Sequence, residues 1–154
     1  MRGCLVFAVC LVAGCVSVPR AMPGPDSNLW NAESPCGTWT IVAYEMYGHR
    51  HALTGEADRF VITETTFERH YATNLQTGTY TVDPTQVPTG IEVELGNAPA
   101  DEKGRKVYPG IYKVENDTLT LCLDMAVTHR TRPKTFSTLA GSHNFVLYIC
   151  RRAR

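Results

Sequence analysis

The stretch GIYKVENDTLTLCLD, residues 110–124, decides the fold class. Aromatic and aliphatic residues alternate with charged ones over 111–115, and leucines alternate with Thr and Cys over 118–123. Apolar residues at every second position indicate strands with one buried face, and the intervening Asn116 and Asp117 favour a tight turn. The stretch is therefore predicted to be a β-hairpin.

The same alternation recurs along the chain from Gly37 onward, with turn residues between the runs. Eight short strands can hide one apolar face and protect both sheet edges by closing into a barrel, so we expect an all-β, eight-stranded antiparallel up-and-down barrel. A β-sandwich is the alternative. Residues 50–58 are expected to hold a short helical turn, and the long connection 124–141 to wrap one end. The expected strands are 38–43, 59–63, 66–71, 79–82, 91–95, 112–115, 118–123 and 145–150.

Composition bounds the function classes. The 154 residues are 44% hydrophobic and 19% charged, which is typical of a globular domain rather than a disordered chain. Fifteen basic residues balance fifteen acidic ones. Because nucleic-acid binding usually needs a basic surplus, a nucleic-acid partner is not expected.

The N-terminal residues read as a targeting signal. Arg2 precedes an apolar run of about ten residues, which is too short to span a bilayer and typical of a signal peptide. The run ends in Val-Ala-Gly-Cys, which resembles a bacterial lipobox, so residues 1–14 are the expected signal peptide and Cys15 the lipidated residue. Ordinary secretion is the alternative. Residues 15–35 are rich in Pro, Gly and Ser and read as a tether. The expected location is the extracytoplasmic side of the cell envelope, where a lipid holds the domain to a membrane.

Gly37-Thr38-Trp39 resembles the Gly-x-Trp that opens the first strand of lipocalins. Further motifs make the chain similar to a small lipocalin-like domain that occurs in many copies in planctomycete bacteria and has no assigned activity. This resemblance covers residues 36–152 and implies a calycin-type barrel. The motifs are GTYTVDPT at 78–85, IEV at 91–93, GIYKV at 110–114, DTLTLC at 117–122 and RPKTF at 132–136.

In such a barrel the first and last strands pair, which brings Cys36 near Cys150. If Trp39 and the set Phe145, Leu147 and Ile149 point inward, both cysteines point outward at one rim, where a disulfide is expected. Cys122 is then the spare thiol, and unbridged thiols are the alternative.

The same alternation points Arg151 inward beside Trp39. Lipocalins use a similar Trp–Arg pair to plug the closed end, and a guanidinium over an indole is a favourable contact. Trp39 and Arg151 are therefore interpreted as structural. The alternative is an exposed basic tail.

Four polar residues of the expected interior are candidate ligand-binding residues: Arg69, Tyr71, Tyr80 and Tyr112. An unpaired buried Arg is costly, so Arg69 should meet an anionic ligand, pair with a residue such as Glu45, or lie at a wet rim. We expect a barrel that binds a small apolar or amphiphilic ligand. A filled barrel that serves as a protein-interaction, structural or enzyme-inhibitor module is the alternative. The sequence shows no catalytic motif, so neither enzyme activity, a cofactor nor a metal is expected.

Overall fold

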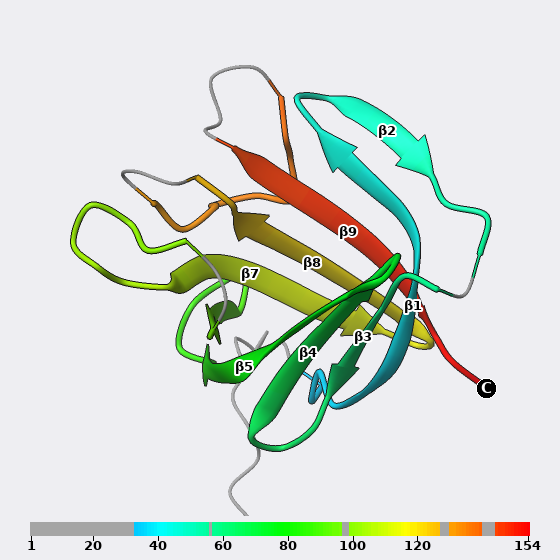
Figure 1. Cartoon of the computed structure of the whole chain (residues 1–154). Helices are drawn as coiled ribbons and strands as arrows, with labels where there is room; N and C mark the ends of the chain where they lie inside the picture. Colours follow the sequence, from blue (N-terminus) through cyan, green and yellow to red (C-terminus); the bar gives the residue numbers. More distant parts are fainter. Residues whose placement is uncertain (1–32, 56, 97–98, 127–129, 140–143) are drawn as a thin grey trace, which may run out of the picture.

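The fold consists of β-strands joined by turns and loops, as the computed structural model shows (Figure 1). It describes residues 33–55, 57–96, 99–126, 130–139 and 144–154, and no helix occurs among them. The predicted signal peptide, the lipidation site at Cys15 and residues 15–32 of the tether lie outside the described residues. The strands are β1 (Gly37–Met46), β2 (His49–Ala52), β3 (Arg59–Ile62), β4 (Thr66–Tyr71), β5 (Asn74–Asp83), β6 (Gly90–Leu95), β7 (Val107–Glu115), β8 (Thr118–Asp124) and β9 (Phe145–Arg152).

The strands form one antiparallel sheet that closes on itself. Neighbours along the chain pair from β3 to β9, and β9 pairs with β1 (Figure 1). β2 and β3 both run antiparallel to β1, opposite its residues 43–46 and 37–40 respectively, so together they take one strand position. The prediction of an all-β, eight-stranded, lipocalin-like up-and-down barrel is confirmed. The helical turn predicted within 50–58 is wrong, because His49–Ala52 pair with β1 as a strand.

Large apolar side chains fill the half of the barrel where β1 begins. Phe60 packs against Phe67 and against the edge of Tyr148, with each pair of ring centroids 5.2 Å apart. Filled interiors of this kind are normal for barrels of eight strands. The fully buried side chains here include Trp39, Phe60, Phe67, Tyr112, Leu119 and Leu121.

Trp39 closes this end of the barrel. Its indole N–H donates to the Pro35 carbonyl at 2.7 Å, and the Arg152 guanidinium carbon lies 4.2 Å from the centre of its ring. Arg152 also donates to the Cys36 carbonyl at 3.3 Å. The expected Trp–Arg plug is present, but the prediction of Arg151 is wrong: the arginine is Arg152.

The alternation of β9 explains this difference. Val146, Tyr148 and Cys150 face the interior, whereas Leu147 belongs to a separate apolar cluster on the outer face. The expected inward set of Phe145, Leu147 and Ile149 was therefore shifted by one residue. Such a shift assigns every side chain of the strand to the wrong face. Both faces of β9 are apolar because the outer face is covered as well. The alternation in the sequence therefore does not show which face of β9 points into the barrel.

The predicted Cys36–Cys150 disulfide is also wrong, since both thiols are free. Cys150 points into the core and pairs with Ile41, which is four residues, or about 13 Å of extended strand, from Gly37. A bridge needs Cα atoms within about 7 Å. The Cys36 thiol instead donates to the Thr63 carbonyl at 3.2 Å.

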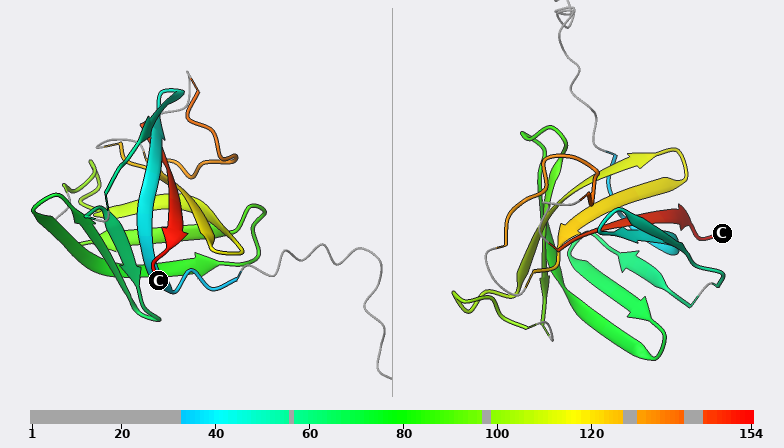
Figure 2. Two further views of the ribbon diagram at one scale, coloured as in Figure 1. Left: turned by 90° about the vertical axis from the view of Figure 1, so that its right-hand side faces the viewer. Right: turned by 90° about the horizontal axis from the view of Figure 1, so that it is seen from above.

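The long connection was predicted to wrap one end of the barrel, but its described residues 130–139 do not. Residues 130–139, called the strap below, run along the outside of the strands (orange in Figure 2). Phe136 packs there against Ile111, Cys122 and Leu147. Near the C-terminal end of the strap, the Thr138 hydroxyl donates to a Glu45 carboxylate oxygen at 2.5 Å. Burial raises the pKa of Cys122, beneath the strap, to about 12.

Candidate functional site

A pocket of about 410 Å³ opens at the end of the barrel opposite Trp39. It is called the mouth pocket below. Its wall combines aliphatic and thioether side chains with three tyrosines, one arginine and one aspartate. Volumes of this size and a mostly apolar lining are typical of small-molecule sites. The lining residues are Ile41, Tyr44, Met46, Leu53, Asp58, Arg69, Tyr71, Met125, Val146 and Tyr148.

A β-bulge in β1 builds one side of this pocket. Opposite β9 the register shifts between Ile41 and Ala43, so one extra residue is inserted and the inward alternation changes step. Trp39 and Ile41 point inward before the bulge, and Tyr44 and Met46 pack against the core after it. Ala43 is buried but lies outside the core cluster, and a tyrosine and a methionine after the bulge line the mouth.

Arg69 is the cation of the mouth pocket. Its guanidinium carbon lies 4.7 Å from the ring centre of Tyr71 and 5.3 Å from that of Tyr148. Its Nε–H is buried without a hydrogen-bond partner. Within the described part of the chain Arg69 forms no ion pair, so the predicted alternative of a Glu45 partner is wrong. Two aromatic rings contact this guanidinium, and no carboxylate of the described residues forms an ion pair with it.

Asp58, the acidic residue of the same wall, is engaged elsewhere. Its Oδ1 accepts a hydrogen bond from the Ala72 N–H at 2.9 Å, in the turn after β4. Ala72 has a positive φ of 48°, which costs energy for a residue other than glycine. The Asp58 carboxylate thus stabilises a strained turn at the rim of the barrel.

A second unpartnered polar group lies directly across from Arg69. Gln76 on β5 is the cross-strand partner of Arg69 on β4, and its Oε1 is buried without a hydrogen bond. A buried acceptor without a partner costs on the order of 1–3 kcal/mol. A donor and an acceptor that both lack partners therefore lie opposite each other near the mouth pocket.

The structure separates the four predicted ligand-binding residues into two pairs. Arg69 and Tyr71 line the mouth pocket, whereas Tyr80 and Tyr112 do not. The Tyr80 hydroxyl donates to the Thr63 carbonyl at 2.8 Å near the closed end, where burial and its contact with Cys36 raise the pKa of Tyr80. Tyr112 is 2% exposed within the core, and this burial raises its pKa.

Three polar residues near the pocket were missed in the sequence: Tyr44, Gln76 and Tyr148. Tyr44 turns inward only because of the bulge. Tyr148 belongs to the β9 set that was assigned to the outside. Gln76 offered a signal, because it lies an even number of residues before Tyr80 on the same strand and thus shares its inward face.

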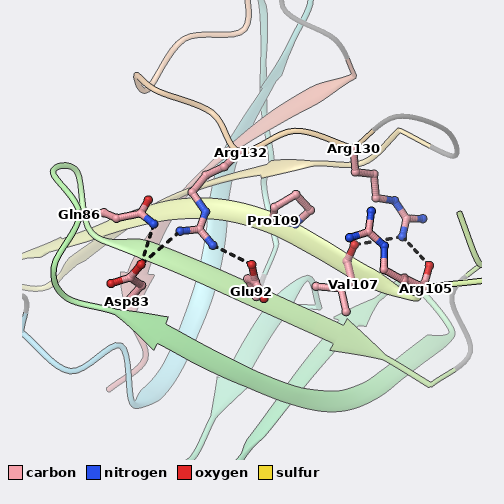
Figure 3. Close-up of a pocket in the computed structure, with 8 residues that line it drawn as sticks. All are labelled: Asp83, Gln86, Glu92, Arg105, Val107, Pro109, Arg130 and Arg132. Atoms are coloured by element: carbon pink, nitrogen blue, oxygen red, sulfur yellow. Dashed lines mark hydrogen bonds and ion pairs between the residues drawn. The ribbon is translucent and has the colours of Figure 1, made fainter. Parts of the chain in front are cut away.

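A second cavity, of about 600 Å³, lies outside the barrel between the strap and strands β6 and β7 (Figure 3). Arg132 bridges Glu92 at 2.8 Å and Asp83 at 3.8 Å. The Asp83 carboxylate also accepts hydrogen bonds from the hydroxyl and the N–H of Thr85. Both bonds lower the pKa of Asp83, and the bond from the hydroxyl has the larger effect. The ion pairs of Arg132 with Glu92 and Asp83 thus hold the strap to the sheet.

Arg130 is fixed at the other end of this cavity. The side chain is 8% exposed, and it donates to the main-chain carbonyls of Ala126, Arg105, Val107 and Pro99. Its guanidinium also covers the ring of Tyr108 at 4.2 Å. Because these arginines already have partners, we interpret the outer cavity as a latch for the strap, whereas Arg69 in the mouth pocket has a buried Nε–H without a partner.

The described residues contain no group of three His, Cys, Asp or Glu side chains arranged to hold a metal ion. In the ranges that the structure describes, no helix is long and apolar enough to cross a membrane.

The fold and the pocket define an all-β, lipocalin-like barrel with a closed, packed end and a hollow mouth. No protein-family model matches the chain, and no curated protein does. Among solved structures it is similar to an uncharacterized protein from Bacteroides eggerthii DSM 20697, with 8% sequence identity and a TM-score of 0.46 over 77% of this chain and 98% of that chain.

Proposed function

We propose that this protein is a binding protein of the cell envelope that holds a small, largely apolar molecule in the mouth of its barrel. The observation that carries the proposal is the mouth pocket, whose wall is mostly aliphatic and aromatic. Burial of apolar ligand surface contributes about 25 cal/mol per Å², so such a wall favours an apolar guest.

The envelope location is part of the proposal and rests on the N-terminal sequence. A short apolar run followed by Val-Ala-Gly-Cys suits lipidation at Cys15, and the Pro-rich tether suits a domain held off a membrane surface. Labelling with a radioactive lipid precursor checks this, because Cys15→Ala should abolish incorporation. Equal labelling of both proteins would contradict lipid anchoring and leave secretion as the alternative.

Titration calorimetry with decan-1-ol, a neutral apolar probe, tests binding in buffer without detergent. The wild-type protein should bind it, and Val146→Phe, which fills the pocket, should weaken binding at least tenfold. Val61→Phe places the same ring on the outer face of β3 and is the matched control. Absence of decan-1-ol binding, or equal loss in both variants, would contradict a ligand site in the mouth.

A protein-interaction module remains the second candidate, and strand β2 favours it. All four residues of β2 are exposed, and within the described sheet it pairs with β1 along one edge only. Free edges can accept a strand from another protein. Native mass spectrometry of the protein from its own host separates the two functions, since a retained small molecule supports the first and a retained polypeptide the second.

A further inference from the structure

The mouth pocket differs from a plain apolar pocket in one respect, namely the state of Arg69. Its guanidinium lines the wall between two tyrosine rings, and no carboxylate of the described residues forms an ion pair with it. Arg69 is partly buried with its Nε–H shielded from water, and a cation in such a place is costly without a counter-charge, whereas the fold supplies ion-pair partners to Arg105, Arg132 and Arg152. A molecule bound in the mouth pocket would be placed to supply the counter-charge of Arg69.

Gln76 adds a second, independent observation. Its unpartnered Oε1 lies across from the unpartnered Nε–H of Arg69 on the neighbouring strand. If the amide accepted the Nε–H, the two Nη groups of Arg69 would be left for a guest. A guanidinium offers donors in a planar fork that matches a carboxylate, and such charged hydrogen bonds are among the strong ones.

We infer that the guest of the mouth pocket is an anionic amphiphile, with a carboxylate-type head group on Arg69 and an apolar body against Met46, Leu53 and Val146. This inference rests on the proposed function and adds the charge of the ligand to it. Tyr71 and Tyr148 hold the guanidinium in place through their ring faces, and Gln76 acts as a positioning residue.

Calorimetry with two probes of equal chain length tests the inference. Decanoate carries the carboxylate, and decan-1-ol has the same body without the charge. The wild-type protein should bind decanoate roughly tenfold more tightly or better, which is the range of a charge-assisted hydrogen bond. Equal affinity for the two probes would overturn the anionic ligand while leaving the apolar pocket intact. Binding of neither probe would overturn the proposed function itself.

Variants then identify the residue that reads the charge. Arg69→Gln should weaken decanoate binding far more than decan-1-ol binding and so remove the preference for decanoate, whereas Arg69→Lys should keep part of the preference. Gln76→Glu places a carboxylate opposite Arg69, so it should compete with the ligand and lower decanoate affinity about tenfold. Arg59→Gln, on the outer face of β3, is the matched control. Cooperative thermal unfolding shows that each variant is folded, and an unchanged preference in both Arg69→Gln and Gln76→Glu would overturn the role of Arg69.

Discussion

The two ends of the barrel are built from the same strands, but they differ in whether their buried polar groups have hydrogen-bond partners. At the closed end Trp39 donates to Pro35, and Arg152 covers the indole and reaches the Cys36 carbonyl. At the open end Arg69 and Gln76 have polar atoms that are buried and unpartnered. A satisfied end contributes to folding stability, whereas an unsatisfied one costs stability and is typical of a binding site.

The largest expected effect is at the closed end. Trp39→Ala should lower the free energy of unfolding by about 3–5 kcal/mol, because a large, fully buried side chain leaves a cavity. Met46→Ala, at the partly buried mouth, should cost markedly less. Urea unfolding measures both values. If the two losses were equal, the contrast between a packed and a hollow end would be wrong.

The buried thiols provide the next test. Burial raises the pKa of Cys122 to about 12 from 9.0, and it also raises that of Cys150. Above pH 9 the unfolded chain therefore loses these protons while the folded protein keeps them. Since the unfolded state binds fewer protons, the free energy of unfolding should fall by about 1.4 kcal/mol per pH unit for each thiol.

Alkylation with iodoacetamide at pH 8 checks the same assignment. In the folded protein the partly exposed Cys36 should be modified well before Cys122 and Cys150, and peptide mass spectrometry follows each site. Urea should make all three react. A linked Cys36–Cys150 peptide in a digest without reductant would restore the disulfide that the structure contradicts.

A pair of variants sharpens the assignment of the plug. Arg152→Met removes the cation above Trp39 and the hydrogen bond to Cys36, so it should lower the free energy of unfolding by about 1–2 kcal/mol. Arg151→Met, its neighbour on the outer face, should change it by less than about 0.5 kcal/mol. Thermal unfolding compares them, and the reverse order would return Arg151 to the interior.

Replacement of Arg69 is predicted to raise the free energy of unfolding, whereas replacement of Arg152 lowers it. Arg69→Met removes an unpartnered Nε–H from the interior and keeps an apolar body of similar length. The free energy of unfolding should therefore rise, by about 0.5–1 kcal/mol, although the contacts with Tyr71 and Tyr148 are lost. A clear loss of stability would mean that Arg69 is a structural residue like Arg152.

The smallest expected effect belongs to the latch on the outer face. Glu92→Gln weakens one ion pair of Arg132, whose other partner Asp83 remains. Partly exposed pairs contribute about 0–1 kcal/mol, so the free energy of unfolding should fall by about 0.5 kcal/mol and ligand binding should not change. A change in decan-1-ol affinity would show that the strap and the mouth are coupled.

Alternation in the sequence was a good guide wherever a strand has one covered face. β4 and β6 fit this description, and their inward residues, including Arg69 and Tyr71, were assigned correctly. In β9 the alternation failed because the core covers one face and Phe136 of the strap covers part of the other. In β1 it failed beyond Ile41 because a bulge adds one residue.

The sequence by itself determined the class of fold, because period-two hydrophobicity requires strands and eight such strands with short connections close most simply into a barrel. It also indicated an arginine on the inner face. The tertiary structure decided which arginine covers Trp39, that the thiols are free and which tyrosines meet Arg69. The physical reason is that a shift of a single residue exchanges the two faces of a strand, and bulges and covering segments set that shift through contacts distant in sequence.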